Sequence, residues 1–198
     1  MRLRTPHGPA LAHLHPADEP IAALVLGHGA GGGVSAPDLV GVTTAALERR
    51  ISVALVEQPY RVAGRRSPAP APQLDAAWAA VVEQLAAGPL AGLALACGGR
   101  SSGARVACRT AVATGAAAIV CLAFPVHPPG RPEKSRLGEL DGVKVPVLVV
   151  QGDRDPFGMP PKRRGRKLLV VEGDHSLRKR VAAYAEAVAD WLVSLDAA

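Results

Sequence analysis

A serine flanked by glycines stands near the middle of the chain, between an apolar run and a helical pattern. In the segment GGRSSGARVA, residues Gly99, Ser101 and Gly103 form the pattern G-x-S-x-G. Between a strand and a helix this pattern is typical of a nucleophile elbow, a strained turn that projects the serine hydroxyl from the edge of a sheet. A glycine-rich turn can produce the same pattern by chance, so the spacing alone leaves both interpretations open.

A second glycine cluster, GHGAGGG at residues 27–33, follows another apolar run. Two chemistries use a glycine-rich loop after a strand. Gly27, Gly29 and Gly32 fit the G-x-G-x-x-G spacing that cradles the pyrophosphate of a dinucleotide. From His28 onward the same segment fits a loop that turns a backbone N–H toward a developing oxyanion. The loop by itself does not distinguish a dinucleotide site from an oxyanion loop.

A carboxylate and a histidine follow the serine along the chain, each just beyond a strand-like run. Asp155 lies in GDRDPFG and His175 lies in GDHS. Proteins that use a nucleophile elbow carry these groups in the order serine, acid, histidine. The carboxyl ends of parallel strands also meet at one edge of a sheet, where ligands gather. Ser101, Asp155 and His175 are therefore the candidate nucleophile, orienting acid and base.

Other residues of the right types are weaker candidates. Asp153 offers a second carboxylate in the same segment, whereas Asp174 directly precedes the candidate base, and adjacent side chains tend to diverge. His127 lies between the serine and the acid, which is the wrong order for the base. His28 belongs to the glycine loop, which we expect it to shape by packing or hydrogen bonding. A dinucleotide site could use Glu57 as a ribose ligand, but it leaves the serine, the acid and the histidine unexplained.

The three cysteines suggest neither a metal site nor a disulfide framework. Cys97, Cys108 and Cys121 lie in apolar surroundings, and buried thiols are inert more often than reactive. Their number is odd, and no cluster of His, Cys and Asp has the spacing of metal ligands. We therefore expect no metal and no cofactor.

The elements that must position these residues alternate along the chain. Apolar runs rich in β-branched residues and leucine predict buried strands, and amphipathic segments between them predict helices. Strands alternating with helices indicate an α/β fold with a mostly parallel sheet covered on both faces. The first fifteen or so residues predict an antiparallel hairpin at one edge. The predicted strands are residues 22–27, 51–59, 90–97, 116–124, 145–152 and 167–173, and the predicted helices are 36–50, 73–88, 102–115 and 176–195.

The composition fits one soluble globular domain over residues 1–198, since 48% of the residues are hydrophobic and 20% are charged. The N-terminus lacks the apolar segment of a secretory signal and no apolar run could span a bilayer, so we expect a cytoplasmic protein without membrane contact. Much of the net charge of +6 lies in residues 162–167 and 178–180. No aromatic residues that would stack on bases interleave there, so we expect a solvated basic face and no nucleic-acid partner.

With these segments in view, the chain resembles a compact α/β-hydrolase of the dienelactone-hydrolase-like kind. GHGAGGG, GGRSSG, GDRDPFG and GDHS carry the resemblance over nearly the whole length. The resemblance implies an α/β-hydrolase fold, with Ser101 as nucleophile, His175 as general base and acid, and Asp155 as the residue that orients His175. The family's G-x-x-D-P-F pattern favours Asp155 over Asp153.

Two features depart from the family's pattern. True dienelactone hydrolases carry a cysteine at the elbow, where this chain has Ser101. Larger lipases and esterases insert a helical cap after the sixth strand, whereas residues 126–141 form a short segment rich in Pro and Gly. We therefore expect an uncapped, open site.

These features predict a serine hydrolase that acts on a small ester-like substrate through an acyl-enzyme. The oxyanion would rest on the Ser102 N–H and on an N–H of the glycine loop, that of Ala30 or Gly31. The alternative is a catalytically idle scaffold of the same fold that binds proteins through its basic segments. An idle scaffold would be free to lose the three candidate residues, and all three are present, which favours the enzyme.

Overall fold

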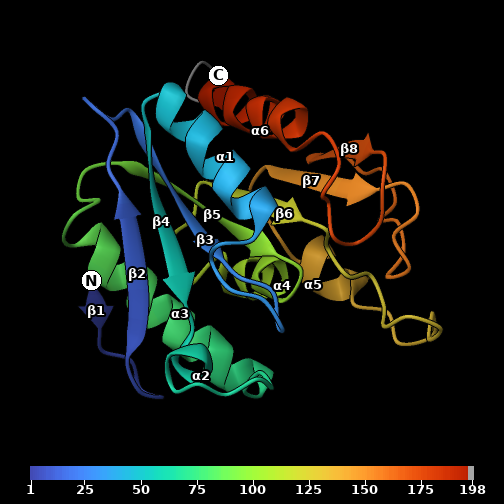
Figure 1. The fold of residues 1–198 in the computed structure, drawn as a ribbon, viewed down its shortest axis with the longest axis horizontal. Coiled ribbons are helices and arrows are strands. Elements are labelled where there is room, and N and C mark those ends of the chain that lie inside the picture. The colour runs from blue at the N-terminus through green and yellow to red at the C-terminus, as the bar shows by residue number, and fades with distance from the viewer. Residues whose placement is uncertain (196–198) are drawn as a thin grey trace.

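The computed structural model describes residues 1–195 and forms one eight-stranded sheet in the order β1-β2-β4-β3-β5-β6-β7-β8 (Figure 1). Residues 196–198 of the predicted domain lie outside the described part. The strands are β1 (Arg2–Leu3), β2 (Ala10–His15), β3 (Ala22–Gly27), β4 (Ile51–Glu57), β5 (Ala94–Arg100), β6 (Ala118–Leu122), β7 (Val147–Gly152) and β8 (Arg166–Val171). The helices are α1 (Pro37–Glu48), α2 (Pro59–Val62), α3 (Ala71–Ala86), α4 (Ser102–Thr110), α5 (Leu137–Asp141) and α6 (Val181–Leu195).

The strand directions follow the predicted pattern. Strands β3 to β8 run parallel to one another, whereas β2 is antiparallel to β4 and β1 is antiparallel to β2. Parallel neighbours need a long crossover connection, and helices supply most of these connections here. The predicted mostly parallel sheet with an antiparallel N-terminal hairpin is therefore confirmed.

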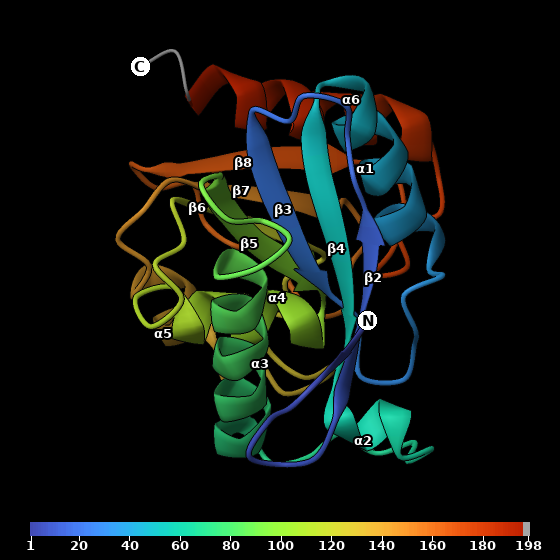
Figure 2. The ribbon, with the colours of Figure 1, turned by 90° about the vertical axis from the view of Figure 1, so that its left-hand side faces the viewer.

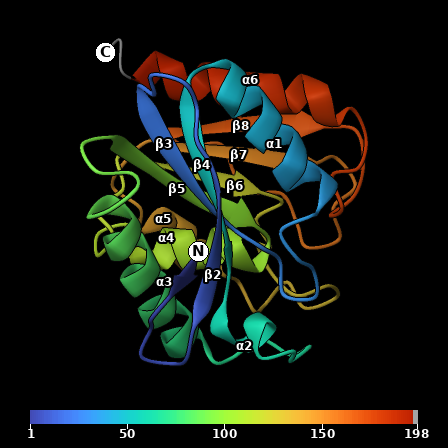
Figure 3. The ribbon, with the colours of Figure 1, turned by 60° about the vertical axis from the view of Figure 1, so that its left-hand side comes forward.

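Helices cover both faces of the sheet (Figures 2 and 3). Helices α1 and α6 lie side by side on one face, and α3, α4 and α5 lie on the other. In β3, Ala23 and Val25 belong to the core beneath α3, together with Trp78, while Leu24 and Leu26 belong to the core beneath α1 and α6. Because both faces are buried, the central strands are apolar without interruption, which made them recognisable in the sequence.

One predicted strand is displaced along the chain. The strand predicted at 90–97 begins only at Ala94 and continues to Arg100 as β5. Before it, the Leu90 N–H donates to the Leu85 carbonyl at 2.9 Å, so this part of the apolar run closes a turn behind α3. The glycines at the other end stay in the strand because they pair with β6, and this pairing outweighs the low strand propensity of glycine.

The helix predicted at 176–195 begins later than expected. It starts at Val181 as α6. Upstream of it, Leu177 and Arg180 have φ values of 49° and 50°, a left-handed conformation that a right-handed helix does not contain. The first residues of the predicted helix are therefore a loop, which extends the segment after β8.

Three further differences concern helices. The helix predicted at 102–115 ends at Thr110 as α4 and gives way to turns. Residues 126–141, for which no helix was predicted, contain α5. Helix α2, which was also not predicted, follows β4 with a proline in its first turn. Helices of four or five residues carry too little hydrophobic periodicity to be recognised in a sequence.

Candidate active site

Ser101 lies in a sharp turn where β5 ends and α4 begins, at the carboxyl edge of the sheet. Its backbone has φ 51° and ψ −104°, a conformation that residues other than glycine rarely adopt. The Ser101 N–H donates to the Leu122 carbonyl of β6 at 2.9 Å, which holds the turn against the sheet. Such strain persists only where the surrounding structure enforces it, and it is common at functional sites.

The glycines on either side of the serine let separate backbone segments touch. A Cβ placed at Gly99 or at Gly103 would strike the carbonyl of Gly27, the last residue of β3. The end of β3, the turn at Ser101 and the start of α4 are therefore packed backbone against backbone. This close approach explains why glycine is needed on both sides of the serine, at positions 99 and 103.

Three side chains from separate strand ends form one hydrogen-bonded series. His175 Nε2 lies 2.8 Å from Ser101 Oγ, and His175 Nδ1 lies 2.8 Å from Asp155 Oδ2. With the Nδ1–H donating to the carboxylate, Nε2 is free to accept the serine hydroxyl proton. The Asp155 side chain is only 1% exposed, whereas that of His175 is 17% exposed. The structure thus brings together the serine, the acid and the histidine that the sequence singled out.

Two hydrogen bonds from neighbouring residues hold the Asp155 carboxylate in position beside the His175 imidazole. Its Oδ2 also accepts from the Gln151 Nε2 at 2.7 Å, and its Oδ1 accepts from the Phe157 N–H at 2.8 Å. The Phe157 ring stacks on the imidazole of His175, with ring centroids 4.0 Å apart. Sequence reasoning used the D-P-F pattern only to choose between carboxylates, and it missed the contacts of Gln151 and Phe157. A polar Gln151 inside an apolar strand run was the sign that could have revealed the first of them.

The rival residues have partners elsewhere. Asp153 Oδ1 accepts from the Gly173 N–H at 2.8 Å, and its side chain is about half exposed. Asp174 Oδ1 accepts from the N–H and the hydroxyl of Ser176, and these hydrogen bonds hold the pKa of Asp174 below its usual range. His127 Nδ1 contacts the Pro128 carbonyl at 2.9 Å. These hydrogen bonds of Asp153, Asp174 and His127 involve neither Ser101 nor His175.

The glycine loop after β3 begins directly against the turn at Ser101. A Cβ at Gly29 would lie 3.8 Å from the Ser101 Cβ. The Gly32 N–H donates to the Gly29 carbonyl at 3.2 Å, and the Tyr60 hydroxyl donates to the Ala30 carbonyl at 3.0 Å. In residues 1–195 no backbone acceptor is found for the N–H of Ala30 or of Gly31. Ser102 is the first residue of α4, so its N–H has no acceptor within the helix.

His28 is held in one protonation state by its contacts. Its Nε2 accepts from the Gln58 N–H at 3.2 Å, and its Nδ1–H donates to the Gly29 carbonyl at 2.8 Å. Burial lowers the pKa of His28, because the charged imidazole would lose its hydration. The neutral ring therefore braces the start of the glycine loop, as the sequence predicted.

A buried ion pair ties the turn at Ser101 to two other elements. Arg100 Nε lies 2.9 Å from Asp38 Oδ2 in the first turn of α1, and Arg100 Nη2 donates to the His175 carbonyl at 3.1 Å. The Asp38 side chain is 1% exposed, and this burial raises its pKa against the opposing effect of Arg100. Sequence reasoning missed this pair, whose two residues are distant in the chain. A carboxylate among the apolar positions of α1 was the only available sign.

The alternative of a dinucleotide site has little support in the geometry. Glu57, its candidate ribose ligand, pairs with His13 at 2.7 Å. The glycines that would have cradled a pyrophosphate begin against the turn at Ser101 instead.

Residues 1–195 gather no group of three or more His, Cys, Asp and Glu side chains that could hold a metal ion. They also include no helix with the length and hydropathy needed to cross a bilayer. The predictions on metals and cofactors therefore stay predictions.

The connection between β6 and β7 is where a cap would be inserted. Residues 126–141 form turns and the short helix α5, which packs against α4. The carboxylate of Glu139 in α5 pairs with Arg105 of α4 at 2.5 Å and with Arg109 of the same helix at 3.2 Å. These contacts hold the segment against α4, on the face of the sheet that α3 and α4 cover.

Comparison with protein families identifies the class to which this fold and site belong. The family model described as the alpha/beta hydrolase domain matches residues 20–192. The chain therefore belongs to the alpha/beta hydrolase family. This assignment confirms the fold class and the resemblance that the four sequence segments indicated.

Solved structures share this fold at low sequence identity. Est1E from Butyrivibrio proteoclasticus is 17% identical, with a TM-score of 0.79 over 100% of this chain and 99% of its own. A serine hydrolase without a lid from Xanthomonas campestris is 20% identical, with a TM-score of 0.77 over 98% of this chain and 93% of its own. Dienelactone hydrolase from Anabaena variabilis is 16% identical, with a TM-score of 0.76 over 98% of this chain and 95% of its own. Comparison with the curated proteins found no match.

Proposed function

We propose that this chain is a serine hydrolase that cleaves small ester-like substrates. The observation that carries the proposal is the continuous hydrogen-bonded series from Asp155 through His175 to Ser101, with 2.8 Å at both links. The strained φ of Ser101 supports it, since strain of this kind accompanies nucleophile elbows. Membership of the alpha/beta hydrolase family and the esterases among the similar solved structures agree with it.

The proposed reaction is acyl transfer to water. Ser101 Oγ attacks the ester carbonyl while its proton passes to His175 Nε2, and Asp155 stabilises the resulting imidazolium. The oxyanion accepts hydrogen bonds from the Ser102 N–H and from the N–H of Ala30 or Gly31. The intermediate collapses, and the alcohol leaves with the proton from the imidazolium. A water molecule, deprotonated by the same imidazole, then releases the carboxylic acid and restores the serine.

The proposed substrate class rests on the expectation of an uncapped site. Helix α5, in the segment between β6 and β7, packs on α4, and we expect an open site that accepts a small or exposed acyl group. In one of the similar solved structures, ferulic acid is bound to Est1E from Butyrivibrio proteoclasticus. Ferulic acid is a carboxylic acid, the class of product that ester hydrolysis releases. The proposed steps use side chains, backbone N–H groups and water, so we expect no cofactor. The expectation of no nucleic-acid partner rests on the lack of aromatic residues among the basic segments. The expected cytoplasmic location stays a prediction.

Hydrolysis of p-nitrophenyl acetate tests the proposal. The native protein should turn over the ester, and Ser101→Ala should lower kcat by about 10³-fold or more, because no nucleophile remains. Ser67→Ala is the matched control, since this serine is exposed in the loop before α3 and should leave turnover unchanged. Circular dichroism of each variant shows whether it is folded.

The same experiment addresses the idle scaffold. A folded native protein without turnover of any p-nitrophenyl ester would favour protein binding through the basic segments 162–167 and 178–180. Turnover that persists in Ser101→Ala would mean that the strained turn is only structural.

A further inference from the structure

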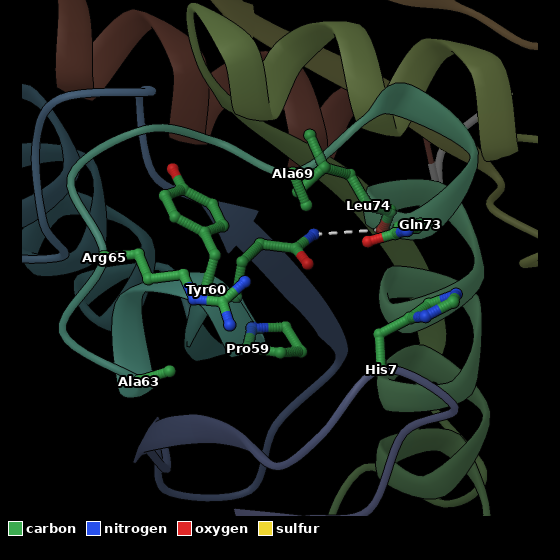
Figure 4. A pocket seen from close by; sticks show the side chains of 9 residues that line it. His7, Pro59, Tyr60, Ala63, Arg65, Ala69, Gln73 and Leu74 are labelled. Carbon is green, nitrogen blue, oxygen red and sulfur yellow. Dashed lines mark hydrogen bonds between the residues drawn. The ribbon is translucent and has the colours of Figure 1, made fainter.

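A cavity lies close to the glycine loop, on the other side of Tyr60 (Figure 4). It has a volume of about 110 Å³ and opens at the carboxyl end of β4. Its walls come from the segment 58–69, from the first turn of α3 and from His7 in the turn between β1 and β2. The residues that line it do not include Ser101, Asp155 or His175.

Gln58, one of the residues that line this cavity, carries a buried hydrogen-bond acceptor. Gln58 is only 6% exposed, and its Nε2 donates to the Leu74 carbonyl at 3.2 Å. The other atom of the amide, Oε1, is buried and has no donor among the described residues. Buried polar atoms are nearly always hydrogen-bonded, because leaving one without a partner costs free energy. An O–H or N–H group of a bound molecule would supply the missing donor.

One side of the cavity rim carries a cation. Arg65 points inward from the loop between α2 and α3 (Figure 4). No Asp or Glu is among the lining residues, so Arg65 meets no opposing charge there. A guanidinium binds carboxylates in a fork of parallel hydrogen bonds, which makes it the natural partner of an anionic group.

We propose that this cavity binds a short hydroxy carboxylate, with its hydroxyl donating to Gln58 Oε1 and its carboxylate accepting from Arg65. The size of the cavity agrees, since about 110 Å³ corresponds to roughly four water molecules at ~30 Å³ each, enough for a ligand such as glycolate or lactate. The aliphatic parts of such a ligand meet Pro59, Ala69 and Leu74.

The ligand site is linked to the glycine loop through residues of its own wall. The Gln58 N–H donates to His28, and the Tyr60 hydroxyl donates to the Ala30 carbonyl at 3.0 Å. A bound ligand would therefore change the environment of Gln58 and Tyr60, the two residues that connect the cavity to the glycine loop. The binding itself does not depend on the chemistry proposed for Ser101.

Titration of isotope-labelled full-length protein with glycolate tests this site. The backbone amide signals of Gln58 and Tyr60 should shift saturably, with a Kd in the millimolar range. Acetate lacks the hydroxyl and glycolamide lacks the charge, so each should bind about ten-fold or more weakly than glycolate. The Ser101→Ala variant should bind glycolate as the native protein does, which separates this site from the proposed hydrolysis.

Variants at the two anchoring residues complete the test. Arg65→Gln should weaken glycolate binding about ten-fold. Arg66→Gln is the control, since Arg66 is exposed like Arg65 but does not line the cavity, and it should leave the Kd unchanged. Gln58→Met should remove the preference for glycolate over acetate. Absence of saturable shifts in the native protein would overturn the proposal, as would equal losses in Arg65→Gln and Arg66→Gln.

Discussion

Asp155 and Asp153 stand in the same loop, yet their surroundings differ in every respect that matters for orienting a histidine. Asp155 is buried and accepts from His175, Gln151 and Phe157, whereas Asp153 is about half exposed and accepts from a backbone N–H. Asp155→Asn should therefore lower kcat for p-nitrophenyl acetate by about 10⁴-fold, since the amide no longer holds the productive tautomer of the imidazole.

Asp153→Asn is the matched control for this prediction. It removes the same charge two positions away and should change kcat by less than about two-fold, because exposed charges contribute little. Steady-state kinetics of both variants decide the assignment. If the larger loss belongs to Asp153→Asn, Asp155 is not the orienting acid.

The stability of the protein should depend on pH through His28. Burial lowers its pKa in the folded state, while the unfolded chain has the ordinary histidine value of about 6.5. The unfolded chain therefore binds the proton at a higher pH than the folded chain does. The contribution of His28 is fully present above about pH 6.5 and is lost as pH falls, by up to about 1.4 kcal/mol per pH unit.

Urea unfolding between about pH 5 and 7 measures this effect. The free energy of unfolding should fall less steeply with acid in His28→Gln than in the native protein, because the variant has no titrating group at this position. His15→Gln serves as the control, since this residue lies in the N-terminal hairpin and should leave the slope unchanged. Equal slopes in the native protein and in His28→Gln would show that His28 is not the titrating group.

At the level of elements, the contact between the end of β3 and the start of α4 depends on glycine. A Cβ at Gly103 would strike the Gly27 carbonyl, and a carbonyl of the backbone cannot turn away as a side chain can. Gly103→Ala should therefore lower the free energy of unfolding by about 1–3 kcal/mol. Gly33→Ala is the matched control, because a Cβ there meets no atom within 4 Å. Urea unfolding of both variants checks the difference, and equal stabilities would contradict the close packing.

The ion pair of Arg100 and Asp38 joins α1, the turn at Ser101 and the loop that carries His175. Asp38→Asn leaves the guanidinium partly buried without its counter-charge, which should lower the free energy of unfolding by about 1.5–3 kcal/mol. Because Arg100 also holds the His175 carbonyl, kcat should fall by roughly ten- to a hundred-fold while KM changes little.

An exposed ion pair provides the comparison for this prediction. Asp190 of α6 pairs with Arg49 at 2.9 Å, but its side chain is 65% exposed. Asp190→Asn should change stability by less than about 1 kcal/mol and leave kcat unaltered. Thermal unfolding and steady-state kinetics distinguish the two variants. A loss of stability in Asp38→Asn without loss of kcat would reduce the pair to a structural role.

Over the whole molecule, the features that followed from burial could be predicted from the sequence. The central strands lie between two helical layers and are apolar throughout, so β3 was predicted at its observed residues, 22–27. Candidate residues at Ser101, Asp155 and His175 could be found because each follows a strand, and the ends of parallel strands meet at one edge.

The features that depend on pairing between distant segments could not be predicted. Nothing in the run 90–97 shows that Leu90 closes a turn behind α3 while the following glycines remain in β5. Asp38 stands among apolar residues of α1, but nothing in the sequence identifies Arg100 as its partner, and only the fold brings the two together in a buried pair. That the amide oxygen of Gln58 is buried without a hydrogen-bond donor likewise becomes apparent only when the separate segments that line the cavity are folded together.

Covalent labelling tests the central claim, that Ser101 is a nucleophile activated by His175. The native protein is incubated with a fluorophosphonate, and intact-mass measurement with peptide mapping locates the adduct. We predict one adduct on Ser101 in the native protein, a strongly slowed reaction in Asp155→Asn, and no adduct in folded Ser101→Ala. A folded native protein that takes no adduct, or that carries it on another residue, would contradict the claim.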